Sequence, residues 1–566
     1  MQDVIKFVEK MKREISKNVK QPLESFADRS KQVLLCEMTR YIDSLFEKDT
    51  TYSHNISYKT ANLIEYAVPL LIQLTALRDR NIIGGPLTPS TIQMKVDIEK
   101  ILDELEIYGL LDTCENYIRS GMMEIKTINE SQMELSFANK YNDLERVDRI
   151  NTVAYSNSML CTLMPYNIKM TKESVIKPIL KKMSNLVYSW QKHFIGYDAD
   201  EEVDDYYIKN AVVDLIQDSE WNSFEQKDKF GDIEYEVFIG AILMLESISI
   251  KHLQFVYLAL EKYSGMDKHN ILPVFDTKQT ICESLQYILN IDEKSALVVL
   301  DMISLKQDDI SLLKDSYLPL PPYIEIAKDN FIRSYAGCLY EPVSYLLFRL
   351  KKRFPRDWDF NIQKREERFR NDIYDLFPDE FYTKLRRNIV LKRDGVVITD
   401  IDACLYDKEA GDVLFIQLKW QDSIYDSFKS MASKRKNYID KVDEWIKTMQ
   451  NWIQTTNVEL IGNHLQMRPD MIDKKKIKLL IVGRYNGEYS SSGRTFKEVV
   501  YCQWFELQRI LLTNKEKVIK GKYKLDDVYK ELMETMQTRE QERDVKSGIE
   551  YNGKSIIYNG FFYNEA

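Results

Sequence analysis

The stretch FIQLKWQDSIYD at residues 415–426 decides how the second half of this chain can be interpreted. It begins as an apolar run typical of a strand and places Gln417 and Lys419 two residues apart within that run. Side chains alternate between the two faces of a strand, so Gln417 and Lys419 share one face while Ile416 and Leu418 share the other. A lysine at the end of a strand that is otherwise apolar is costly to bury without partners. We therefore expect oppositely charged groups close to it.

The preceding segment, GVVITDIDACLYD at residues 395–407, supplies such groups. If this segment is one strand, alternation places Asp400, Asp402 and Cys404 on its polar face. The opposite face then carries Ile401, Ala403 and Leu405. The turn DKEAGD at 407–412 would pair this strand with the next. Two carboxylates, an amide oxygen and an ammonium would then converge on one face. A divalent cation offsets the repulsion between carboxylates, and hard oxygen ligands suit Mg²⁺.

The elements around these two strands follow a recognisable order. The pattern predicts a helix over 361–377, strands over 386–394, 395–407 and 412–420, a long helix over about 426–453, strands over 476–485 and 497–504, and a helix over 504–512. Asp394-Gly395 is a strong hairpin signal between the first two strands. The expected order is therefore α-β-β-β-α-β-β-α.

The D-x-D pair, the turn and the strand ending in Q-x-K resemble the PD-(D/E)XK superfamily of restriction-endonuclease-like nucleases, in the Q-x-K variant of its Mrr-like members. The resemblance covers about 361–512 and implies an αβββαβ core. It also implies that Asp402 binds metal, that Gln417 is the acidic-or-amide ligand, and that Lys419 is the catalytic lysine. Glu366 matches the glutamate often found on the first helix, and Glu367 is the weaker match. Asp400 is an auxiliary ligand or, because neither aspartate follows a proline, the alternative to Asp402.

The chain divides in composition as well as in pattern. Residues 1–350 carry 39 Lys and Arg against 53 Asp and Glu, whereas residues 351–524 carry 35 against 26. The apolar spacing is helical almost everywhere up to about 315, and prolines cluster at 319–322. We therefore expect an α+β protein: a large all-α region at 1–325, for target or partner recognition, a nuclease-like domain at 326–515, and a helix with a β-hairpin at 516–566.

The function that these patterns favour is a nuclease that uses Mg²⁺ or Mn²⁺ to hydrolyse phosphodiester bonds, with DNA the expected substrate and restriction or antiviral defence an analogy from the fold. The alternatives are a helical scaffold carrying an inactive nuclease fold and a surface sheet whose polar face is only solvated. The basic residues Lys434, Arg435 and Lys436 are candidate phosphate contacts. No apolar run of membrane-spanning length occurs and the seven cysteines are scattered. We expect a cytoplasmic protein with free thiols, either alone or as a homo-oligomer.

Overall fold

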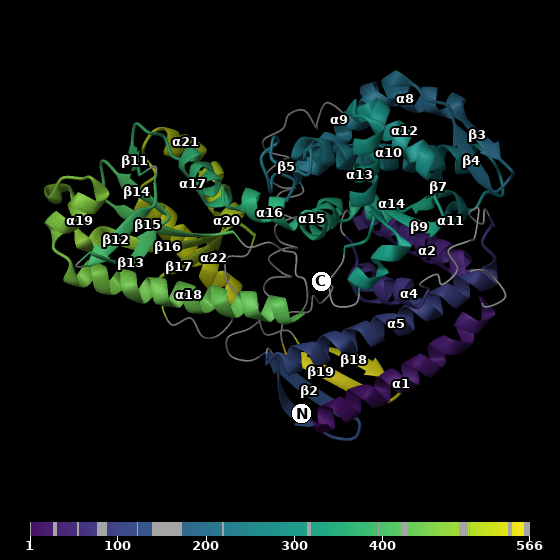
Figure 1. The fold of residues 1–566 in the computed structure, drawn as a ribbon, viewed down its shortest axis with the longest axis horizontal. Coiled ribbons are helices and arrows are strands. Elements are labelled where there is room, and N and C mark those ends of the chain that lie inside the picture. The colour runs from purple at the N-terminus through teal and green to yellow at the C-terminus, as the bar shows by residue number, and fades with distance from the viewer. Residues whose placement is uncertain are drawn as a thin grey trace.

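The computed structural model describes residues 2–26, 31–53, 56–75, 88–121, 123–137, 173–217, 220–313, 319–385, 387–393, 395–420, 428–485, 496, 498–541 and 546–559. It is a mixed α+β structure with a helix-rich region followed by a region built on a sheet (Figure 1). No helix in these ranges is long and apolar enough to cross a membrane. Six of the cysteines are free and buried, as expected, and Cys161 lies outside the described ranges.

Helices dominate the N-terminal region. They are α1 (Gln2–Ser25), α2 (Lys31–Ser53), α3 (Tyr58–Asn62), the π-helix η1 (Leu63–Ala67), α4 (Val68–Leu74), α5 (Ile92–Arg119), α8 (Glu173–Leu186), α9 (Glu201–Gln217), α10 (Tyr235–Lys262), α11 (Lys268–Ile271), α12 (Lys278–Leu289), α13 (Glu293–Met302), the 3₁₀ helix η2 (Gln307–Leu313), α14 (Tyr335–Leu339), α15 (Pro342–Arg353) and α16 (Pro355–Ile362). The expectation of a helical region is therefore confirmed.

The expectation that this region is all-α is wrong, because short strands interrupt the helices. They are β1 (Met123–Ile128), β2 (Gln132–Phe137), β3 (Val187–Trp190), β4 (Phe194–Tyr197), β5 (Lys229–Phe230), β6 (Ile233–Glu234), β7 (Val274–Thr277), β8 (Ser304–Leu305), β9 (Tyr323–Ala327) and β10 (Asn330–Arg333). One sheet has the order β7-β10-β9-β8. Each strand is six residues or shorter, too short for the period-two pattern to stand out against the flanking helical pattern.

The C-terminal region alternates strands and helices. Its elements are α17 (Arg365–Asp375), β11 (Tyr382–Lys384), β12 (Ile389–Arg393), β13 (Val396–Ile401), β14 (Ala403–Asp407), β15 (Val413–Lys419), α18 (Phe428–Thr455), α19 (Val458–Leu465), the 3₁₀ helices η3 (Pro469–Met471) and η4 (Lys474–Lys476), β16 (Ile477–Gly483), β17 (Val500–Gln503), α20 (Trp504–Thr513), α21 (Lys515–Ile519), α22 (Leu525–Gln541), β18 (Lys546–Tyr551) and β19 (Lys554–Asn559). The helix and strand types predicted over 361–512 are confirmed.

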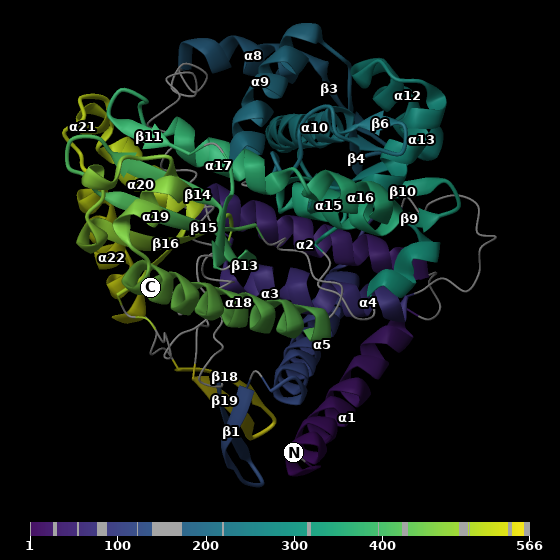
Figure 2. The same cartoon turned by 60° about the vertical axis from the view of Figure 1, so that its left-hand side comes forward.

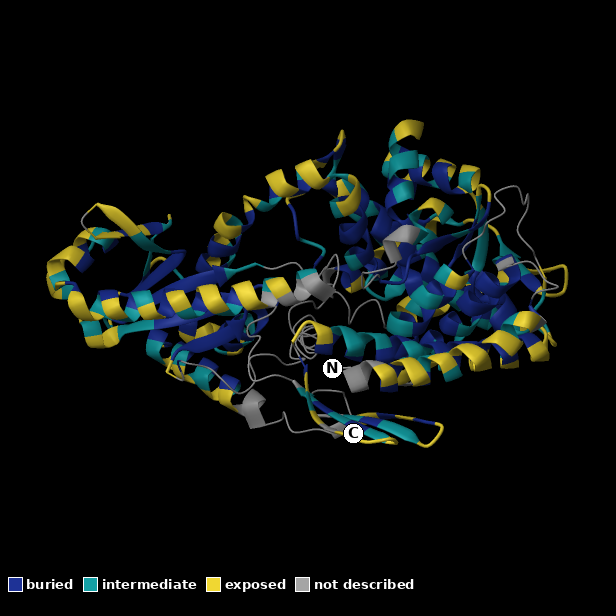
Figure 3. Ribbon diagram, turned by 60° about the horizontal axis from the view of Figure 1, so that its bottom comes forward, coloured by how far each residue is buried: buried dark blue, intermediate teal, exposed yellow. Residues whose placement is uncertain are grey.

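A five-stranded sheet with the order β11-β14-β15-β16-β17 organises this region. β14 pairs antiparallel with β15, and β15, β16 and β17 run parallel. One face packs on α17, α20 and α22 through a core that includes Phe369, Leu507 and Val528. The other packs on α18 and α19 through a core that includes Trp445 and Ile461. The sheet is thus the middle of three layers, and α18 exposes its outer stripe (Figure 3).

The predicted second strand is in fact two strands that belong to two sheets. β13 pairs with β12 in a separate two-stranded ribbon, and β14 enters the main sheet beside β11, which the sequence did not predict. The chain bends at Asp402, between β13 and β14. The predicted grouping of Ile401 with Ala403 is therefore wrong: Ile401 packs in the α18 core and Ala403 in the α17 core. Gly395 has a positive φ, as a hairpin turn requires, while Asp394 lies outside the described residues.

The hydrophobic cores show how the chain is divided. The N-terminal core extends past residue 325 to Trp358, and the core of the main sheet begins at Phe369. The predicted hairpin near the C-terminus forms as β18 and β19, but it packs in the N-terminal region. β19 adds parallel to β2, giving a four-stranded sheet with the order β1-β2-β19-β18. Figure 2 shows this sheet beside α5 and α1. The C-terminal extension thus links both regions.

Candidate active site

Asp402 lies at the bend between β13 and β14, directly beside β15. Ala403 is opposite Ile416 in the antiparallel pair, so Asp402 comes next to Gln417. Its Oδ2 accepts hydrogen bonds from the backbone N–H of Leu418 at 2.7 Å and from Gln417 Nε2. Asp402 and Gln417 are both buried. The structure thus brings together the aspartate and the glutamine that the sequence predicted as a pair.

The environment of Asp402 disfavours its charged form. Burial, together with the nearby charges of Glu366 and Asp400, raises the pKa of this carboxyl to about 7. The Leu418 N–H and the Lys419 ammonium act in the opposite direction but do not cancel the burial. A buried carboxylic acid that titrates near neutrality beside a lysine is typical of a functional site, although structural acids also do this.

Lys419 ends β15 and is half-buried. Burial lowers the pKa of its ammonium, and the carboxylates of Asp402, Asp400 and Glu366 oppose that change in this order. Lys441 on α18 also lowers it, so this second lysine lies within electrostatic reach of the site. Asp402, Asp400 and Glu366 therefore all lie near enough to the end of β15 to influence the pKa of Lys419.

Glu366 reaches this point from α17. Its Oε1 accepts hydrogen bonds from Asn388 Nδ2 at 2.6 Å and from a terminal nitrogen of Arg370 at 3.1 Å. The Nε of Arg370 donates to the backbone oxygen of Asp402. Arg370, which the sequence did not suggest, thus links the predicted glutamate to the predicted aspartate. Glu367 is exposed on the same helix and stays the weaker match.

Asp400 belongs to the ribbon strand β13, one residue before the end of that strand. Its backbone oxygen accepts a 2.7 Å hydrogen bond from Trp445 Nε1, which fixes the ribbon to α18. Its carboxylate is half-buried and influences the pKa of both Asp402 and Lys419. Asp400 is therefore a neighbour of the site rather than a residue remote from it.

The donor chemistry fits a hard divalent cation, because the polar groups at this point are carboxylates and one amide. Within the described residues, however, no three His, Cys, Asp or Glu side chains are grouped so as to hold a metal ion. The amide of Gln417 presents its nitrogen to Asp402. A site for Mg²⁺ or Mn²⁺ would form only after the Gln417 amide turned its oxygen toward the ion. Its ligands would be Asp402, Gln417, Asp400 and Glu366.

Trp420, the residue after Lys419, is surrounded by arginines. The guanidinium carbons of Arg484, Arg365 and Arg368 lie 4.7, 5.3 and 5.8 Å from the centre of its indole ring. Arg484 also donates its backbone N–H to the oxygen of Lys419 at 2.8 Å. No local pattern predicted this cluster, because Trp420 and Arg484 lie far along the chain from the two arginines of α17.

The same arginines connect the site to the N-terminal region. Arg365 Nε donates to the backbone oxygen of Ser223 at 3.2 Å, and Arg484 donates to Asn222 Oδ1 at 3.2 Å. The hydroxyl groups of Ser223 and Tyr485 lie 2.9 Å apart. A loop of the helical region therefore packs directly against the strand ends that carry the candidate site.

The predicted phosphate contacts lie on the first turns of α18. Lys436 is exposed and Lys434 is half-buried and engaged in an interaction, while the side chain of Arg435 lies outside the described part. Lys441, which no sequence pattern singled out, is exposed, and its charge lowers the pKa of Lys419. The run of three basic residues suggested Lys434, Arg435 and Lys436. The pattern that could have indicated Lys441 is its position on α18, four residues before Trp445.

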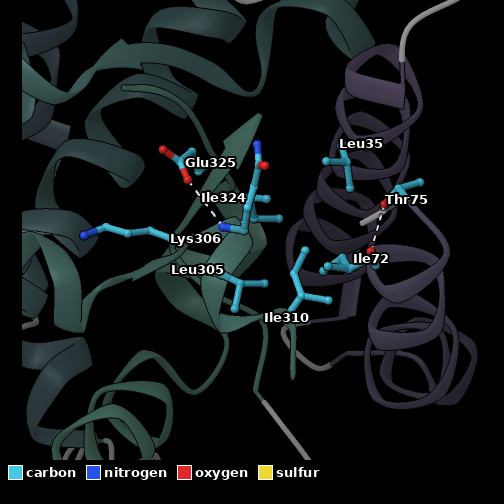
Figure 4. Close-up of a pocket in the computed structure, with 9 residues that line it drawn as sticks. Leu35, Ile72, Thr75, Leu305, Lys306, Ile310, Ile324 and Glu325 are labelled. Carbon is cyan, nitrogen blue, oxygen red and sulfur yellow. Dashed lines mark hydrogen bonds between the residues drawn. The ribbon is translucent and has the colours of Figure 1, made fainter. Parts of the chain in front are cut away.

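A small pocket lies elsewhere, between α2 and α4 on one side and β8, η2 and β9 on the other (Figure 4). Its volume of about 10 Å³ leaves room for roughly one water molecule. Its walls are mostly apolar, and Glu325 accepts a 3.3 Å hydrogen bond from the backbone of Gln307. It is too small for an organic ligand and lies apart from the candidate site.

Comparison with known proteins gives no further constraint. No protein-family model, no curated protein and no solved structure matches this chain.

Proposed function

We propose that this chain is a metal-dependent nuclease of the PD-(D/E)XK type, hydrolysing phosphodiester bonds of DNA with Mg²⁺ or Mn²⁺. The observation that carries the proposal is the buried carboxyl of Asp402, hydrogen-bonded to Gln417 and within the electrostatic field of Lys419. Burying these groups together costs free energy. That cost is understandable at a catalytic site and has no evident purpose in a solvated sheet.

Each residue has a distinct task in this proposal. Asp402, with Asp400, Gln417 and Glu366, supplies oxygen ligands, and its charged form becomes favourable when a cation is near. The bound cation would supply a Lewis acid at the scissile phosphate and lower the pKa of an attacking water. The Lys419 Nζ ammonium stabilises negative charge that develops on the phosphate only in the transition state. Arg370 holds the backbone of Asp402 and orients Glu366.

A second candidate function is a binding or scaffold protein that carries an inactive nuclease fold. The specific observation in its favour is that the described residues hold no preassembled group of three acidic or imidazole ligands. The hydrogen bond from the amide nitrogen of Gln417 to Asp402 is also compatible with a purely structural pair.

The deciding experiment is a cleavage assay on duplex DNA, single-stranded DNA and RNA with Mg²⁺, Mn²⁺ or EDTA. We expect cleavage that requires the cation and is lost in Lys419→Ala. The matched control is Lys209→Ala, which removes an exposed lysine from α9. A wild-type protein that is inert on every substrate and binds no Mn²⁺ would favour the scaffold. Equal cleavage by Lys419→Ala and wild type would show that the cleavage does not depend on this site.

A further inference from the structure

Two neighbouring residues of the N-terminal region, Asn222 and Ser223, accept hydrogen bonds from three arginines of the C-terminal region. Asn222 accepts from Arg368 through its backbone oxygen, and from Nη2 of Arg484 through its Oδ1 at 3.2 Å. The backbone oxygen of Ser223 accepts from Nε of Arg365 at 3.2 Å. One short loop thus supplies acceptors to the cluster of arginines that surrounds the end of β15.

This loop takes its position from the N-terminal region. The residue after Ser223 is Phe224, which is buried in the N-terminal core. Its ring packs edge-to-face at centre-to-centre distances of 5.0, 5.3 and 4.9 Å on Phe230, Tyr235 and Trp358, which belong to the same core. The acceptors that the arginines use are therefore anchored outside the sheet that carries the candidate site.

Arg484 makes the most direct link between this loop and the site. It follows the end of β16, where Gly483 is paired with Lys419, and its backbone N–H donates to the Lys419 oxygen at 2.8 Å. Its side chain is buried, and Nη1 donates to Asp372 on α17 at 2.7 Å. The backbone that holds Lys419 and the guanidinium that reaches Asn222 therefore belong to one residue.

Trp420 holds the chain on the other side of Lys419. The guanidinium carbon of Arg365 lies 4.4 Å from the ring centre of Phe224 and 5.3 Å from that of Trp420. A guanidinium over an aromatic face is attracted by the ring quadrupole, so Arg365 joins the two rings. Trp420 also packs edge-to-face on Phe369 at 5.8 Å. Both neighbours of Lys419 in space are thus tied to the N-terminal region.

These contacts are an expensive way to join two regions. Gathering guanidinium groups out of water costs free energy, because each loses its hydration and repels the others. Burial lowers the pKa of Arg368, and the charge of Arg484 adds to that change while Asp372 opposes it. An apolar contact would join the regions without this cost. The arginines therefore have a purpose beyond packing, and they surround the residue next to Lys419.

We propose that Arg484 is a positioning residue for Lys419 and that Asn222 of the N-terminal region sets its position. The inference rests on the proposed nuclease function and adds to it a dependence of the site on the N-terminal region. Arg484, held between Asn222 and Asp372, fixes the end of β16, and its N–H then fixes the end of β15. The Lys419 ammonium is thereby kept in the orientation that stabilising the transition state requires.

A positioning role predicts a particular kinetic signature. Asn222→Ala should lower kcat roughly tenfold per folded molecule and leave KM within about twofold, because a catalytic group is displaced and no substrate contact is lost. Asn222→Asp restores an oxygen acceptor for Arg484 and should return kcat to within about twofold of wild type. The matched control is Asn463→Ala, which changes an exposed asparagine of α19. The folded fraction is measured by circular dichroism.

A double-variant cycle tests whether Asn222 acts through Arg484. Arg484→Met removes the guanidinium but keeps an apolar stem, and it should lower kcat roughly a hundredfold. Adding Asn222→Ala to Arg484→Met should lower kcat no further, because the contact that they share is already gone. Losses that multiply in the double variant would overturn the inference, since Asn222 would then act by another route.

Fluorine NMR gives a readout that does not depend on cleavage. The chain has seven tryptophans, and after labelling with fluorotryptophan the Trp420 signal is assigned through Trp420→Phe. We expect Asn222→Ala to shift the Trp420 signal and Asn222→Asp to return it. An unchanged kcat or an unchanged Trp420 signal in Asn222→Ala overturns the inference and leaves a cleaving wild type intact. A wild type that cuts no substrate refutes the nuclease proposal, whereas a Trp420 response in that protein would still show that Asn222 holds the end of β15.

Discussion

Two buried aspartates, one in each region, look alike by burial and differ in what surrounds them. Asp43 on α2 is 0% exposed and Asp402 is 2% exposed, and burial raises the pKa of each carboxyl to about 7. Asp43 accepts hydrogen bonds from the Ser334 hydroxyl at 2.6 Å and from the backbone N–H groups of Tyr335 and Ala336 at 3.0 and 2.9 Å. Asp43 therefore serves as the hydrogen-bond acceptor for the backbone N–H groups in the first turn of α14.

Asp402 has a different set of neighbours. It accepts one backbone N–H and one amide, and it lies among the charges of Glu366, Asp400 and Lys419. Asp43 has a cation, Arg333, as its charged neighbour. A raised pKa thus marks both residues, whereas neighbouring carboxylates, those of Glu366 and Asp400, add to the rise at Asp402 and are not among the main causes at Asp43. The neighbours, and not the pKa, separate a structural acid from a candidate ligand.

The largest expected contrast is in cleavage. Asp402→Asn should reduce metal-dependent cleavage at least about a hundredfold, because the carboxylate charge that attracts the cation is removed. Asp43→Asn should keep wild-type turnover per folded molecule. The rates are measured with Mn²⁺ after correcting for the folded fraction by circular dichroism. Equal losses in the two variants would erase the distinction drawn between these aspartates.

For the free energy of unfolding, we expect the larger effect at Asp43 and the smaller one at Asp402. Asp43→Ala leaves the donors at the start of α14 without their buried acceptor and should lower the free energy of unfolding by about 2–4 kcal/mol. Asp402→Ala leaves the Leu418 N–H and the Gln417 amide without this acceptor but relieves the repulsion from Glu366 and Asp400, so it should cost less, about 1 kcal/mol. Urea denaturation of both variants measures this. A larger loss at Asp402 would assign it a structural role.

A pH series refines the comparison. In both aspartates the folded-state pKa is raised above the unfolded value of 3.8. The stability that each contributes is therefore complete below about pH 4 and is lost as the pH rises through about 7. In this window each aspartate should therefore lower the free energy of unfolding by up to about 1.4 kcal/mol for every unit by which the pH rises. Mn²⁺ should restore stability near pH 8 in the wild type and in Asp43→Asn, but not in Asp402→Asn. Thermal unfolding with and without Mn²⁺ tests this, and restoration in Asp402→Asn would contradict it.

The smallest effect is expected at Gln417. Gln417→Glu places another carboxylate beside Asp402 and restores the commoner acidic ligand, so cleavage should stay within about tenfold of wild type. The added charge should raise the metal-free pKa of Asp402 further, which NMR of the labelled carboxyl can follow. Complete loss of cleavage in Gln417→Glu would show that the amide is needed as a hydrogen-bond donor.

The local pattern predicted much of the C-terminal region because turn residues separate its strands and because β15 and β16, of seven residues each, are long enough to stand out. The pairing of Asp402 with Gln417 followed from alternation and one short turn. The predicted alternation of faces breaks at Asp402 because the chain passes there from the two-stranded sheet of β12 and β13 to the five-stranded sheet. No local pattern indicates which sheet a strand will join. Arg370, the arginines around Trp420 and the strands among the N-terminal helices depend on contacts between distant segments, which one sequence does not reveal.

The addition of β19 to β2 has a consequence for the order in which the protein is made. β2 ends at Phe137 and β19 ends at Asn559. At synthesis rates of about 5–20 residues per second, roughly 20–85 s separate the emergence of the two strands from the ribosome. During that interval the edge of β2 that β19 will cover has no strand partner from this sheet. The N-terminal region is therefore made first and completed last, after every residue of the candidate site, from Glu366 to Lys441, has been made.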